Sequence, residues 1–143
     1  MNVTAAIFAR LKADASVIAA LQTYGDGPAV FDDAAPDDFV LADGKMLIVI
    51  AAALSNEPDD TLTEMGRLIR QEVRLYARHS GDNAALDALA VHVRKLLHAQ
   101  PALTVTGGLL TFATASGPVA SPTTDPALVG RRVSLRINTE ETV

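Results

Sequence analysis

The apolar residues of the chain recur with two different spacings. In residues 4–21 and 82–99 they return every three to four positions on a background rich in alanine and leucine, which predicts two amphipathic helices. Ser80 or Asp82 can cap the start of the second helix. Each helix has an apolar side, so each must pack on another layer of the protein.

Other segments have the patterns of β-strands. Residues 45–54 form a continuous apolar run, typical of a strand buried on both faces. Residues 64–78 and 131–138 alternate between apolar and polar positions, which predicts strands with one face buried. In the first of these, Gln71 is the one polar residue of the inward row. Gly107–Gly108 predicts a hairpin between residues 103–106 and 109–113.

Glycine, proline and polar residues mark the rest of the chain. We expect a loop at 25–44 with one extended piece at 29–31, a loop at 55–63, a loop at 116–126 with a short strand near Val119, and a frayed acidic tail at 139–143.

The predicted order is helix, strand, strand, helix, hairpin, strand. This order favours an α+β fold with a mostly antiparallel sheet and two helices packed on one face. A length of 143 residues fits a single domain over residues 1–143. The opposite face of the sheet would then carry Arg70, Arg74, Arg132 and Arg136, exposed to water or to a partner.

Composition narrows the classes of function. The chain has no cysteine, which excludes disulfide frameworks, thiolate metal sites and cysteine nucleophiles. A mean hydropathy of +0.22 is too high for a disordered chain. The longest apolar run, residues 46–54, is far shorter than the roughly 20 residues that span a bilayer, and the first residues lack the pattern of a signal peptide. We therefore expect a soluble, non-secreted protein without membrane contact.

Charge is unevenly distributed around a total of −5. Residues 1–43 hold seven acids against Arg10 and Lys12, a net of −5, whereas residues 64–80 hold four arginines against two glutamates, a net of +2. A protein whose main task is to wrap nucleic acid is normally basic overall. An acidic segment and a mildly basic strand favour association between copies instead.

The residue types of known catalytic and metal sites do not converge in this sequence. The three histidines are not spaced as a ligand set, and the aspartate pairs 32–33 and 37–38 lack the spacing of a calcium loop. There is no Gly-x-Ser-x-Gly elbow, and Gly25-Asp26-Gly27 leads into proline rather than a helix. We expect no catalytic residue, no metal, no cofactor and no enzymatic activity.

The arginines on the exposed row of residues 64–78 have three interpretations. They form an ordinary solvated face, a subunit interface, or the inner wall of a ring, and arginine is enriched at interfaces. An RNA-binding sheet is poorly supported, because only Tyr76 is placed to stack on a base.

The order of the segments and their residue patterns resemble those of a known protein family. The segments that carry the likeness are "DASVIAAL" at the end of the first helix, the buried strand "KMLIVIAA", the strand "RLIRQEVRLYAR" leading into "DNAALDALAVHVRKLL", and the terminal strand "RRVSLRI". Together they resemble the tail terminator (tail completion) proteins of long-tailed phages, found also in prophages and gene transfer agents. The lengthened stretch 113–130 departs from that pattern.

The resemblance implies a structural virion protein that forms a hexameric ring on the tail tube. Such a ring ends polymerisation of the tube protein and offers a surface to the head-side connector at the tail–neck junction. The implied partners are other copies of the chain, the tail tube protein, the head-side connector protein and DNA in transit. The protein would be in the bacterial cytoplasm during assembly and in the phage-like particle afterwards.

Two sets of residues are candidates for these contacts. We expect Arg70 and Arg74, or Arg132 and Arg136, to meet the acidic loop of a neighbouring copy in a salt-sensitive contact; the acidic residues are Asp32, Asp33, Asp37 and Asp38. In the loop 55–63 we expect Asn56, Glu57, Asp59 and Asp60 to contact the tube or the neck.

Two other functions remain open from the sequence. One is a head-side connector (stopper or adaptor) protein of a phage or gene transfer agent, which shares the size and ring symmetry. The other is a small ligand-binding α+β domain, because a fold alone does not exclude a function.

Overall fold

The structure is a computed structural model that describes residues 3–58, 64–98 and 109–142. Three helices and eight strands lie within these ranges. In chain order they are α1 (Val3–Lys12), α2 (Ala15–Ala20), β1 (Thr23–Tyr24), β2 (Gly27–Pro28), β3 (Val30–Asp32), β4 (Met46–Ile50), β5 (Ser55–Pro58), β6 (Glu64–Arg78), α3 (Ala84–Leu97), β7 (Leu109–Ser121) and β8 (Leu128–Thr142).

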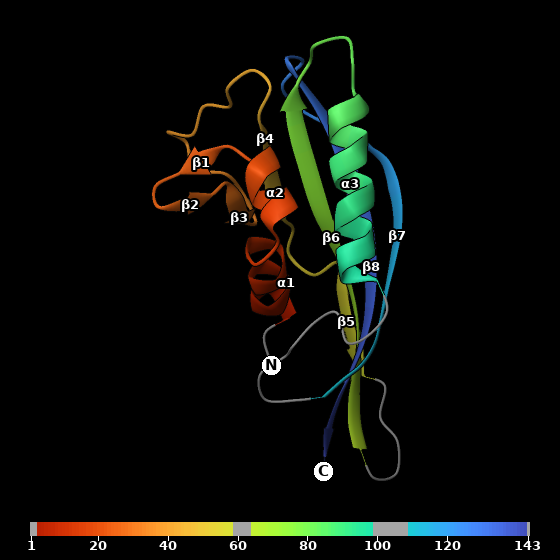
Figure 1. The fold of residues 1–143 in the computed structure, drawn as a ribbon. Helices are drawn as coiled ribbons and strands as arrows, with labels where there is room; N and C mark the ends of the chain where they lie inside the picture. The colour runs from red at the N-terminus through yellow and green to blue at the C-terminus, as the bar shows by residue number, and fades with distance from the viewer. Residues whose placement is uncertain (1–2, 59–63, 99–108, 143) are drawn as a thin grey trace.

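The main sheet has the order β3-β4-β6-β8-β7, and β5 pairs with β6 beyond the end of β4. Its centre is the long antiparallel pair β6 and β8, in register from Glu64↔Thr142 to Arg78↔Leu128. This pair extends well past the helices at one end of the molecule (Figure 1). All pairs are antiparallel except β3 with β4, so the predicted α+β class with a mostly antiparallel sheet is confirmed.

The helices pack on one face of this sheet, where they close the main core (Figure 1). Ile7 and Leu11 of α1, together with Leu89 and Val93 of α3, lie against the inward rows of the strands. The inward row of β6 is the one predicted from its alternation, and Gln71 is buried within it. Its amide nitrogen donates to the Ala51 carbonyl and to the Thr4 hydroxyl, both at 2.8 Å, so this buried donor group is hydrogen-bonded.

The predicted helix over residues 4–21 is wrong in one respect, because it is two helices. Asp14 has an extended backbone, and its side chain accepts a hydrogen bond from the Val17 amide at 3.0 Å, so it ends the first helix and caps the second. The break also shifts the helical phase. Val17 is fully buried, whereas Ile18, which a continuous helix would bury, is 43% exposed.

The second predicted helix begins later than expected. It starts at Ala84 rather than at residue 82, and Asn83 holds the N-cap position without a side-chain hydrogen bond. Asp82 still serves the helix start, because its carboxylate accepts from the Ala84 amide at 2.9 Å.

Two predicted loops are in fact partly strands. Residues 55–58 form β5, which pairs with residues 67–70 of β6. Residues 109–121 form one strand, β7, with register shifts near residues 111 and 117–118, so the expected loop begins only after Ser121. The extended piece expected at 29–31 corresponds to β3 (Val30–Asp32), which pairs with β4 in parallel.

The end of the chain is also more ordered than predicted. Residues 139–142 continue β8 and pair with β6, and Thr139 is buried, so the expectation of a frayed tail is wrong for these residues. The expected hairpin has its first strand and its Gly107–Gly108 turn outside the described residues. Its second strand is the start of β7.

Candidate interaction surface on the sheet

The face of the sheet opposite the helices, called here the outer face, carries the arginines singled out by the sequence. The register of β6 and β8 sets Arg70 directly opposite Arg136, and Arg74 directly opposite Arg132. Glu72 lies between the two pairs on β6. The four arginines expected on one face are therefore brought together on two adjacent strands.

Glu72 organises two of these arginines. Its side chain is only 10% exposed, although the alternation of β6 places it in the polar row. One carboxylate oxygen accepts from Nε and Nη2 of Arg74, both at 3.1 Å, and the other lies 3.5 Å from Nη1 of Arg132. Both arginines lie half-buried beside it, so they compensate the carboxylate charge that burial would otherwise penalise.

Arg70 and Arg136 are in a different situation. Both are exposed, and within the described part of the chain neither side chain makes a hydrogen bond or an ion pair. A groove of about 350 Å³ lies beside them, with Thr114, Ser116 and Ser134 in its lining.

A second, smaller apolar cluster covers the other part of the outer face. Leu47 and Val49 of β4 pack there with Ala29 and Leu41, joined by the Tyr76 ring. The sequence predicted that β4 is buried on both faces, but it did not identify the cover on the outer face. That cover is the loop after β3, which folds back over β4. The continuous apolar run of β4 indicated that such a cover exists, because a strand buried on both faces needs another layer on each face.

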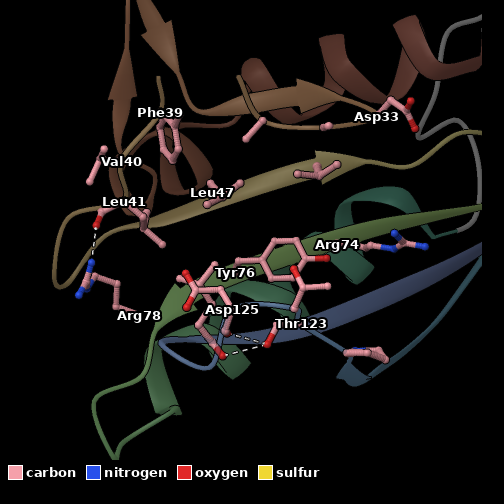
Figure 2. A pocket seen from close by; sticks show the side chains of 16 residues that line it. Asp33, Phe39, Val40, Leu41, Leu47, Arg74, Tyr76, Arg78, Thr123 and Asp125 are labelled. Carbon is pink, nitrogen blue, oxygen red and sulfur yellow. Dashed lines mark hydrogen bonds between the residues drawn. The ribbon is translucent and has the colours of Figure 1, made fainter. Parts of the chain in front are cut away.

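A groove of about 530 Å³ opens beside this cluster (Figure 2). Phe39, Val40 and Leu41 line one side, Thr123 and Asp125 line the other, and Leu47 and Tyr76 lie between them. Arg78 at one end donates to the Leu41 carbonyl at 3.4 Å. More than half of its lining residues are apolar.

The acidic segment, residues 26–43, holds six aspartates and no basic residue. Two of the six are engaged within the chain. Asp43 pairs with Nε of Arg78 at 2.8 Å, and Asp38 accepts from the Tyr24 hydroxyl at 3.1 Å, a hydrogen bond that raises the pKa of Tyr24. Asp32, Asp33 and Asp37 are exposed, and their side chains make no hydrogen bond or ion pair in the described structure.

The candidate contact loop is only partly described. Asn56 and Glu57 lie exposed on β5, opposite Ile69 and Leu68 of β6. Asp59 and Asp60 lie outside the described residues.

Two of the three histidines have side-chain partners within the chain. Nε2 of His92 lies 2.9 Å from Oδ1 of Asp14, a hydrogen bond that joins α3 to the start of α2 and lowers the pKa of Asp14. Nδ1 of His98 accepts from the Ala115 amide of β7 at 3.1 Å. Over residues 3–58, 64–98 and 109–142, no group of three histidine or acidic side chains is arranged to hold a metal ion. No helix in these ranges is long and apolar enough to cross a membrane.

Comparison with known proteins adds a likeness in structure. No family model matches the chain, and no curated protein matches it. A chain in the solved structure of the virion of a native gene transfer agent (GTA) particle superposes with a TM-score of 0.77. The match covers 97% of this chain and 95% of the other, at 18% sequence identity.

The two chains share a fold. The likeness spans the helices and the sheet alike, because almost the whole of both chains is matched.

Proposed function

We propose that this protein is a structural component of a phage-like particle and forms a ring, a hexamer in the particle, that caps the tail tube. One observation carries the proposal: the whole chain has the fold of a chain in a GTA virion. The resemblance of its sequence to tail terminators, described above, supplies the more specific role. The cap would end tube polymerisation and present a surface for head joining.

The surfaces of the protein support a role in assembly. A ring needs two different patches on each copy that fit each other head to tail. The outer face and the acidic segment are oppositely charged patches on one chain, as such a contact requires. We propose that the basic side of the contact is drawn from Arg70, Arg74, Arg132 and Arg136, and that the acidic side is drawn from Asp32, Asp33, Asp37 and Asp38 of the next copy.

The proposed partners follow from the role. They are further copies of the chain, the tail tube protein and the head-side connector protein, with DNA passing through the ring. Asn56 and Glu57 on β5, together with Asp59 and Asp60, are the proposed contact residues for the tube or the neck. A cap of this kind acts through its shape and surface charge, without catalysis or a cofactor, at the tail–neck junction of the particle.

Native mass spectrometry at low salt followed by negative-stain imaging tests the ring. The proposal predicts hexamers with six-fold rings at high protein concentration or on tube ends. A protein that stays monomeric under both conditions would overturn it. Incubation with purified tail tube protein and with head-side connector protein separates the two phage-like roles, because a head-side adaptor would bind the connector and leave the tubes uncapped.

A further inference from the structure

The four arginines of the outer face divide into two pairs with different surroundings. Arg74 and Arg132 both turn to the buried carboxylate of Glu72. Their charge is therefore partly compensated within the chain, and their side chains are held in place by it. They are poorly placed to receive an incoming acidic group.

Arg70 and Arg136 stand directly opposite each other in the β6–β8 register. Like charges in directly opposed positions of a sheet destabilise it. Both side chains are exposed, and no acidic side chain of the described chain lies within ion-pair distance of either. The pair therefore carries a local excess of positive charge that an anion would relieve.

The neighbouring positions are suited to the same anion. Thr114 of β7 pairs with Arg136, and Ser116 pairs with Ser134, so hydroxyl residues extend the arginine rows across the sheet. These three residues and both arginines line one groove of about 350 Å³. Guanidinium groups beside hydroxyl donors match the oxygens of a carboxylate, which arginine can bind through two parallel hydrogen bonds.

We propose that Arg70 and Arg136 together form the receiving site for aspartates of the acidic segment of a second copy. The inference rests on the proposed ring and names the two arginines that make its contact. Charge complementarity selects the occupant. Asp32, Asp33 and Asp37 are exposed and unpaired, whereas Asp38 and Asp43 are engaged by Tyr24 and Arg78 within their own chain.

The test compares two double variants of the full chain by sedimentation velocity over a range of protein concentrations at low salt. Arg70→Gln with Arg136→Gln removes the proposed site. Arg67→Gln with Lys95→Gln is the matched control, because it removes the same charge from exposed positions away from the outer face. We expect association to weaken about tenfold or more in the first variant and to stay within about twofold of wild type in the control.

Thermal unfolding distinguishes loss of the contact from loss of the fold. At a protein concentration and salt concentration at which both proteins are monomeric, removing two opposed like charges should leave the melting temperature of the first variant unchanged or raised. A melting temperature lowered together with association would overturn the inference, because the arginines would then support the fold itself.

A charge exchange tests the occupant. Copies with Arg70→Glu and Arg136→Glu, and copies with Asp32→Lys and Asp37→Lys, should each associate weakly alone and regain association when mixed. Failure of the mixture to recover would overturn the pairing. So would a short DNA duplex that binds wild type but not the Arg70→Gln, Arg136→Gln variant while association is unchanged, because the site would then receive phosphate.

Failure of this inference is distinct from failure of the proposed function. Hexamers of normal strength in the Arg70→Gln, Arg136→Gln variant would overturn the receiving site and leave the ring standing. Absence of any ring of wild-type protein, alone or on tubes, would overturn both.

Discussion

Single residues hold the elements of this protein together, and Asp14 has two such roles. It caps α2 through the Val17 amide and accepts a hydrogen bond from His92 of α3. We expect Asp14→Ala to lower the free energy of unfolding by about 0.5–2 kcal/mol, the usual cost of losing a cap. Urea denaturation measures the change. An unaltered midpoint would show that neither bond stabilises the fold.

The same residue predicts a pH dependence. The hydrogen bond from His92 holds the pKa of Asp14 below its usual value. A carboxyl with a lowered folded-state pKa stabilises the protein above its unfolded pKa of about 4, and that stabilisation is lost as the pH falls through the folded value. Asp14→Asn should therefore lose less stability than wild type between about pH 5 and pH 2. Parallel pH curves of melting temperature for the two proteins would contradict this.

Glu72 is the residue whose environment sequence reasoning missed. Alternation predicts a solvent-exposed side chain at this position. In the structure its carboxylate pairs with Arg132 of the neighbouring strand and with Arg74 of its own strand. We expect Glu72→Gln to destabilise the protein by about 1–3 kcal/mol, because two arginines lose their carboxylate. Exposed Glu57→Gln is the control for a change of one charge, and equal denaturation midpoints for the two variants would refute the role of Glu72.

At the scale of elements, neighbouring strands lie so close to Gly130 that a side chain added there would be crowded. Gly130 of β8 pairs with Tyr76 of β6, and a Cβ added there would lie 2.9 Å from the Ser121 carbonyl oxygen and 2.9 Å from the Tyr76 ring. We expect Gly130→Ala to cost about 1–3 kcal/mol through overpacking. Ser134→Ala on the same strand should be nearly neutral. If calorimetry finds the two variants equally stable, the strands are not packed this closely.

Elements with a long, regular pattern were predictable, and those set by contacts distant in the sequence were not. The bounds of β6 follow from its alternation. The continuous apolar run predicted the buried strand β4, which ends at Ile50 rather than at residue 54. The sequence did not predict the break at Asp14, because apolar residues keep a helical spacing across it. The cap at Asp14 starts a new helix, in which Val17 rather than Ile18 is the buried residue. β5 was predicted to be a loop because its residues, Ser55–Pro58, are three polar residues and a proline, and they depend on β6 for their pairing.

The sequence predicted which arginines share the outer face, but not which of them pair with Glu72. Alternation alone placed Arg70, Arg74, Arg132 and Arg136 on one face, and the structure brings them onto adjacent strands. Glu72 pairs with Arg74 and Arg132 but not with the other two arginines. This difference depends on the register of β6 against β8, which no local pattern in either strand determines. The second apolar cluster depends in the same way on a loop folding back over β4.

At the scale of the whole molecule, charge governs the proposed assembly. Exposed ion pairs contribute only about 0–1 kcal/mol each and are screened by salt, so a ring closed by them is salt-sensitive. We expect the hexamer to dissociate as sodium chloride rises from about 50 mM to 500 mM, as followed by sedimentation velocity. A ring indifferent to salt would indicate closure by apolar contacts such as the groove beside Tyr76.

The most direct test of the proposed function is the polymerisation of purified tail tube protein with and without this protein, followed by electron microscopy. The proposed function predicts shorter tubes that stop growing, each with a six-fold ring at one end. Tubes that grow to the same length, with no ring at either end, would contradict it.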